Sequence, residues 1–142
     1  MTGKTDFTEE EWNLVREGPP TAGMIVLLAS KGGSFRETWA LAKTFAETRQ
    51  QQGESELVDA IAADKPDTPR FHSAEEAEQQ GLEGLRQAVA LVQQKATPEE
   101  VESYKRFALE VARRVAEAHE EEGQAVSQDE QEAITKIESA LG

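Results

Sequence analysis

The sequence predicts an all-α fold, a single-domain bundle of about six or seven helices. Apolar residues recur with the period of an amphipathic helix, and no stretch alternates between apolar and polar positions as a strand does. A Ser or Thr is followed three positions later by Glu at five predicted helix starts, a pattern called the capping box. The 142 residues are enough to bury a core without the help of disulfide bonds, which the absence of cysteine excludes.

The capping boxes set the order of the predicted helices along the chain. They are Thr8 with Glu11, Ser34 with Glu37, Ser73 with Glu76, Thr97 with Glu100, and Ser127 with Glu130. At Thr97 the prediction is strengthened by Pro98, whose fixed φ suits the first helical position, and by a hydrophobic staple between Ala96 and Val101. Phe7 and Trp12 are placed to form the same kind of staple at the first helix.

The segment from Pro20 to Ser30 has no polar face and is predicted to be a short helix at the centre of the bundle. Its hydrophobic part, Met24 to Leu28, is expected to be buried and surrounded by amphipathic helices. A break at Gly18-Pro19-Pro20 is expected to separate it from the first helix. The remaining core residues are expected at helical spacing in four segments. They are Phe35, Trp39, Ala42 and Phe45; Leu57, Val58 and Ile61; Leu82, Leu85, Val89 and Val92; and Val101, Tyr104, Ala108, Val111 and Val115.

The breaks between these segments are short, so residues 1–142 are expected to form one domain, with residues 1–6 as a flexible tail. The start of the chain lacks the order of a secretory signal, which favours the cytoplasm. The longest apolar run, Met24 to Ala29, is too short to span a membrane. The pairs Glu102 with Arg106 and Glu110 with Arg114 are spaced to stabilise a helix surface.

The net charge of −13 argues against nucleic acid and anionic lipid as partners, because the chain repels phosphate groups. Nothing in the sequence favours catalysis. The two histidines offer few acid or base groups, and no Gly-x-Ser-x-Gly motif is present. The glycine-rich turn from Ser30 to Ser34 lacks the order of a P-loop and is explained by helix caps. We therefore expect a protein that is not an enzyme.

An acidic segment, His119 to Gly123, is the strongest candidate for a site. Its three consecutive Glu residues fall at a predicted helix C-terminus, whose negative dipole repels them unless solvent, a basic side chain or a bound cation compensates. Carboxylate oxygens suit Ca²⁺ or Mg²⁺, and His119 adds a nitrogen ligand for Mn²⁺ or Zn²⁺. A solvated acidic turn explains the same residues without a metal.

The C-terminal stretch Glu122-Gly-Gln-Ala-Val-Ser-Gln-Asp-Glu130, followed by Ile134, Ile137 and Leu141-Gly142, resembles the second half of the TerB-like tellurite-resistance family. The resemblance covers about 25 of the 142 residues, with Glu122 where the family has Asp and one extra residue between Gly123 and Val126. It implies an all-helical fold, divalent cation binding and a role in bacterial stress responses. The family's acidic positions carry over to Glu122, Asp129 and Glu130.

Two functions are therefore expected from the sequence. In the first, an acidic TerB-like protein binds divalent cations or partner proteins through the carboxylates of residues 119–130, with His119, Glu122, Asp129 and Glu130 as the metal ligands. In the second, a metal-free interaction module or homodimer binds a protein partner or a second copy through an exposed apolar helix face, with no catalytic activity.

Overall fold

The computed structural model describes residues 6–29, 43, 46–47, 56–63, 73–121 and 128–142, and among these residues it contains helices and no strand. The predicted all-α class is confirmed. The helices are α1 (Glu9–Ala29), α3 (Glu56–Ala63), α4 (Ala74–Lys95), α5 (Pro98–Glu121) and α6 (Gln128–Leu141). Residues 43, 46 and 47 are helical as well. The described part of the chain thus holds these five helices, and the predicted total of six or seven is not confirmed.

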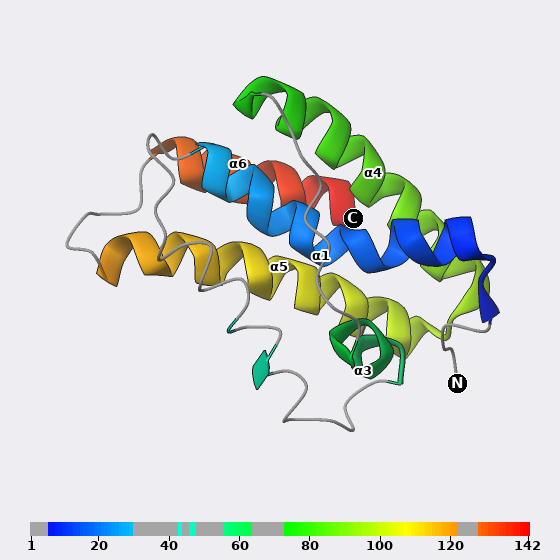
Figure 1. Ribbon diagram of the computed structural model, residues 1–142. Helices are drawn as coiled ribbons and strands as arrows, with labels where there is room; N and C mark the ends of the chain where they lie inside the picture. Colours follow the sequence, from blue (N-terminus) through cyan, green and yellow to red (C-terminus); the bar gives the residue numbers. More distant parts are fainter. Residues whose placement is uncertain (1–5, 30–42, 44–45, 48–55, 64–72, 122–127) are drawn as a thin grey trace.

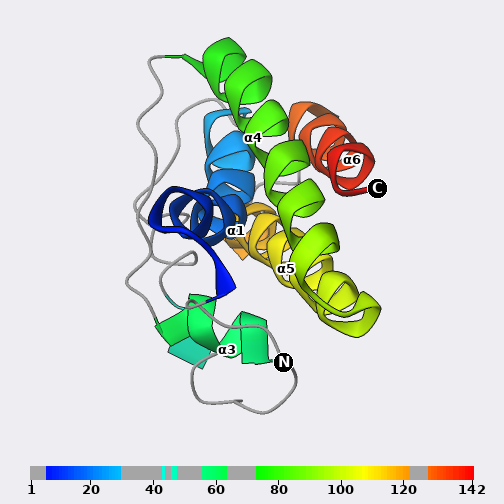
Figure 2. The same cartoon turned by 90° about the vertical axis from the view of Figure 1, so that its right-hand side faces the viewer.

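Helix α1 runs through the middle of the bundle and contacts α4, α5 and α6 (Figure 1). Figure 2 shows α4 and α6 on one side of α1, and Figure 1 shows α5 running below α1. The short helix α3 packs against α5. None of the helices in the described ranges is long and apolar enough to cross a membrane.

The predicted core positions in α3, α4 and α5 are confirmed. The buried residues among them are Leu57, Val58, Ile61, Leu82, Leu85, Val89, Val92, Val101, Tyr104, Ala108, Val111 and Val115. Trp12 joins the same core, and the centroid of its ring lies 5.9 Å from that of Phe7, which confirms the staple at the start of α1. The aromatic segment from Phe35 to Phe45 and the turn from Ser30 to Ser34 lie outside the described residues.

Two capping boxes are confirmed by both of their hydrogen bonds, and the box at Ser73 is confirmed in the bond from the Glu76 amide to the Ser73 hydroxyl. The amide of Glu11 donates to Thr8 Oγ1 at 3.2 Å, and the amide of Thr8 donates to the Glu11 carboxylate at 2.9 Å. The corresponding bonds form at the start of α5 and, from the amide of Glu76 to the Ser73 hydroxyl, at the start of α4. Ser34 and Ser127 lie outside the described residues. The ion pair between Glu110 and Arg114 is also confirmed, at 3.4 Å.

The predicted break at Gly18-Pro19-Pro20 is wrong, because α1 continues through it to Ala29. Proline has no amide hydrogen, so the carbonyl of Val15 loses the helical hydrogen bond that residue 19 would donate. The hydroxyl of Tyr104, on α5, donates to this carbonyl at 2.7 Å in the buried interior. A side chain from another helix therefore replaces the missing donor, a compensation that local sequence rules do not include.

Glycine is required at position 18 because of this arrangement. A Cβ at Gly18 would lie 2.0 Å from the Tyr104 hydroxyl oxygen. With α1 unbroken, the apolar segment Met24–Leu28 is the C-terminal part of α1 and does not form a separate helix. Within it Ile25 and Val26 are buried, whereas the other three residues are partly exposed.

Candidate functional site: an acidic groove between three helices

The four predicted metal ligands lie around the connection between α5 and α6. His119 belongs to the last turns of α5 and Asp129 to the first turn of α6, but the side chains of both lie outside the described part, as does the whole of Glu122. Glu130 is described and is fully buried in the first turn of α6. No group of three or more His, Asp or Glu residues within the described ranges could hold a metal ion. The metal site remains a prediction.

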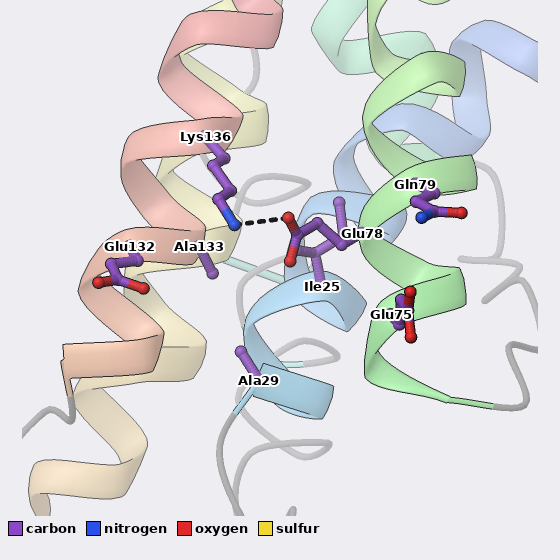
Figure 3. A pocket seen from close by; sticks show the side chains of 8 residues that line it. All are labelled: Ile25, Ala29, Glu75, Glu78, Gln79, Glu132, Ala133 and Lys136. Atoms are coloured by element: carbon purple, nitrogen blue, oxygen red, sulfur yellow. Dashed lines mark hydrogen bonds and ion pairs between the residues drawn. The ribbon is translucent and has the colours of Figure 1, made fainter.

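The structure contains another candidate site, which the sequence did not predict. A cavity of about 410 Å³ opens between the C-terminal part of α1 and the N-terminal halves of α4 and α6. We call it the acidic groove. Its lining residues are Ile25, Ala29, Glu75, Glu78, Gln79, Glu132, Ala133 and Lys136 (Figure 3).

The floor of the acidic groove is apolar. It consists of Ile25 and Ala29 of α1 and Ala133 of α6, of which Ile25 and Ala133 are buried in the core. Helix α4 lies close to α1 beside this floor. Gly81 permits the close approach, since a Cβ at this position would lie 2.9 Å from Cδ1 of Ile25. Small residues on α1, α4 and α6 therefore leave a hollow that is bounded by the longer polar side chains.

The rim of the acidic groove carries three carboxylates and one ammonium group. Glu75 lies on the α4 side and Glu132 on the α6 side, while Glu78 reaches from α4 to meet Lys136 of α6 (Figure 3). The distance from Nζ of Lys136 to Oε1 of Glu78 is 2.5 Å. This hydrogen bond, with smaller contributions from the charges of Glu78 and Glu132, raises the pKa of Lys136. The carboxylates outnumber the ammonium group, so the rim is negative.

The end of α1 adds to this negative potential. Carbonyl groups at a helix C-terminus carry about half a negative charge, and α1 has no basic residue in its last turn to balance it. Glu78 and Glu132 are each the fifth residue of their helix. The favourable helix dipole at an N-terminus falls off within the first turn, so the dipole does not account for these two carboxylates.

A second cavity, of about 390 Å³, lies between α5 and the C-terminal part of α6. Its charges are more nearly balanced, because Lys105, Arg106 and Arg113 face Glu102 and Glu138. Two of the cations are already paired there, Lys105 with Glu102 at 3.8 Å and Arg113 with Glu138 at 3.5 Å. The acidic groove is the more strongly polarised of the two cavities.

The acidic groove contains carboxylates, one amide and one amine, but no hydroxyl, thiol or imidazole among its lining side chains. Its carboxylates lie beside the apolar floor formed by Ile25, Ala29 and Ala133. The groove is therefore equipped to bind a cationic group beside an apolar one. Comparison with protein-family models, curated proteins and solved structures found no match to this chain.

Proposed function

We propose that this chain is a binding protein without catalytic activity, and that its acidic groove receives a basic, partly apolar segment of a partner protein. The observation that carries the proposal is the convergence of three carboxylates and the end of α1 on an apolar floor. The proposal is closest to the second function expected from the sequence, a metal-free interaction module, but it uses Glu75, Glu78 and Glu132 and not the carboxylates of residues 119–130.

The chemistry of the partner follows from the groove. An apolar side chain of the partner would cover Ile25, Ala29 and Ala133, while Lys or Arg one helical turn away would meet the glutamates of the rim. Opposite charges at a rim raise the rate of association and select among partners, and salt weakens them. Binding should therefore weaken as the ionic strength rises.

The experiment is a titration of the protein with a synthetic helical peptide that carries Leu and Arg one turn apart, followed by fluorescence anisotropy. The double variant Glu75→Gln with Glu132→Gln should bind about tenfold more weakly, because each exposed charge pair contributes modestly to affinity. A matched control is Glu9→Gln with Glu99→Gln, which removes the same charge from exposed first turns of α1 and α5. Equal affinity in both double variants would contradict the proposal.

A second candidate function is divalent cation binding at the connection between α5 and α6. It is supported by the resemblance of Glu122, Asp129 and Glu130 to the acidic positions of the TerB-like family, which also suggests a role in stress responses.

Calorimetric titration of chelator-treated protein with Ca²⁺, Mg²⁺, Mn²⁺ and Zn²⁺ tests this second function. Stoichiometric binding should raise the melting temperature and should be lost in Glu122→Gln with Asp129→Asn. The groove variant Glu75→Gln with Glu132→Gln is the control and should keep it. Heat that is weak, non-stoichiometric and abolished by salt would argue against a metal site.

A further inference from the structure

The ion pair between Lys136 and Glu78 joins α6 to α4 across the acidic groove. We propose that Lys136 competes with the partner for Glu78, because its ammonium group binds the carboxylate that a cation of the partner must bind. This inference rests on the proposed function. It adds that Lys136 sets the affinity of the acidic groove and its selectivity among cationic partners.

The position of the pair supports this inference. Lys136 and Glu78 both line the groove, and their contact lies above the floor near Ile25 (Figure 3). Any ligand whose cation reaches Glu78 meets the ammonium group of Lys136 in the same place. The ligand must displace that group or share the carboxylate with it, and sharing lowers the affinity because the two cations repel each other.

Displacement should be easy, because the pair is accessible to water. The side chains of Lys136 and Glu78 are 46% and 44% exposed. Exposed ion pairs contribute little to stability, since both side chains are well solvated when they separate. Lys136 would exchange protein contact for water, while the partner would gain both the carboxylate and the apolar floor.

The geometry also favours arginine over lysine in the partner. Lys136 provides a single contact to Glu78, and a lysine of the partner would only substitute one ammonium group for another. The planar guanidinium group of arginine donates several hydrogen bonds in a fixed fork and can bind a carboxylate through two of them. We therefore expect an arginine-containing segment to displace Lys136 better than its lysine counterpart does.

The test compares the affinity of the Leu and Arg peptide for the wild type, Lys136→Met and Lys95→Met. Methionine keeps much of the length of the aliphatic chain and removes the charge. Lys95 is a matched control, because it is also paired with a glutamate, Glu11 at 2.7 Å, but lies outside the acidic groove. Lys136→Met should bind about threefold to tenfold more tightly than Lys95→Met, as expected for the loss of one competing charge.

The outcomes separate this inference from the proposed function. If the wild type binds the peptide and Lys136→Met binds no more tightly than Lys95→Met, Lys136 is only a structural link between α4 and α6. If none of the three proteins binds the peptide, the proposed function itself fails. Melting curves of both variants establish that they are folded before the affinities are compared.

A second measurement needs no variant. Titration of the Lys136 side chain by NMR should show the pKa of its ammonium group falling toward the ordinary lysine value when the arginine peptide binds, because Glu78 is then taken by the guanidinium group. Substitution of Lys for Arg in the peptide should reduce this change. A Lys136 pKa that stays the same in the saturated complex would overturn the inference.

Discussion

Helix α1 meets its neighbours in two contrasting ways along its length. In its middle, Val15, Gly18 and Tyr104 form a closed contact that we call the Tyr104 junction, which holds one hydrogen bond in the buried interior. At its C-terminal end, α1 lines the acidic groove, which is open and charged. One helix therefore has a sealed contact and an open one.

The difference lies in how each region satisfies its polar groups. At the Tyr104 junction, the carbonyl left without a helical partner by Pro19 is satisfied by the Tyr104 hydroxyl, so this carbonyl is not available to an outside ligand. At the acidic groove, the last turn of α1 has no basic residue, and among the lining residues only Lys136 opposes the glutamates of the rim. Substitutions at the junction should thus change the free energy of unfolding, whereas substitutions at the groove should change binding.

The largest effect is expected for Gly18→Ala. The added Cβ would lie 2.0 Å from the Tyr104 hydroxyl oxygen and 3.1 Å from Cζ of the same ring. The ring must move, which adds the cost of overpacking to the loss of its hydrogen bond, about 3 kcal/mol or more of unfolding free energy in total. Urea unfolding followed by circular dichroism measures this loss.

The double variant Gly18→Ala with Tyr104→Phe is the control for this mechanism. Phenylalanine lacks the oxygen atom that collides with the methyl group added at position 18, so the two effects should not add. The double variant should be more stable than the sum of the two single losses predicts. Simple additivity would mean that Gly18 is required for a reason other than the Tyr104 hydroxyl.

The next effect concerns Tyr104, which is the only tyrosine of the chain. Burial raises its pKa above the ordinary value of 10.0. The unfolded chain therefore loses the phenolic proton at a lower pH than the folded chain does. The contribution of the buried neutral phenol to the free energy of unfolding is therefore fully present below pH 10. It is lost as the pH rises above 10. Tyrosinate absorbance should appear only as the helical signal is lost, and a tyrosinate midpoint near 10 in a protein that keeps its helices would contradict the burial.

Tyr104→Phe separates the hydrogen bond from the ionisation. At neutral pH this variant should lose about 1 to 3 kcal/mol, because the Val15 carbonyl is left buried without its donor. It should also unfold less steeply at alkaline pH than the wild type, since it has no phenol to ionise. A variant as stable as the wild type at neutral pH would show that water reaches the carbonyl.

The same contrast explains how much of the molecule the sequence predicts. Helical period and capping boxes predict α3, α4 and α5 with their core positions, because these signals depend on neighbours within one or two turns. The continuity of α1 through Pro19 and Pro20 depends on Tyr104, which is 89 positions away from Val15. Local rules for proline cannot include a donor that arrives from another helix.

The acidic groove escapes sequence analysis for a similar reason. Within α4, Glu75 and Gln79 share a helix face, as do Glu132 and Lys136 within α6. Such faces are ordinary on a surface helix in an acidic chain. The groove forms because these two faces lie side by side over the apolar residues Ile25 and Ala29 of α1. Glu78 and Lys136, which meet across it, are 58 positions apart in the sequence. The acidic segment from His119 to Gly123 is easier to recognise in the sequence than the groove, because its charges are contiguous.

A smaller effect is expected where α4 lies against α1. Gly81→Ala places a Cβ 2.9 Å from Ile25 Cδ1 and 3.0 Å from Thr21 Cγ2, so these side chains must shift. Gly84→Ala on the same helix meets nothing within 4 Å. Alanine favours a helix over glycine by about 1 kcal/mol, so Gly84→Ala should be more stable than the wild type and Gly81→Ala less stable than Gly84→Ala. If both variants gain the same stability, the Ile25 side chain can move away from the added methyl group without cost, and the groove floor is not rigid.

The smallest effect on stability is expected for Lys136→Met. The Lys136 and Glu78 side chains are both exposed to water, so the urea midpoint at neutral pH should move less than in any of the preceding variants. Because Glu78 raises the pKa of Lys136, the contribution of the pair is fully present below pH 10.5 and is lost as the pH rises through the higher value of the folded chain. The midpoints of the wild type and the variant should therefore converge at alkaline pH. A large loss at neutral pH would make the Lys136 pair a structural contact like the Tyr104 junction, and the contrast between a sealed and an open region of α1 would no longer hold.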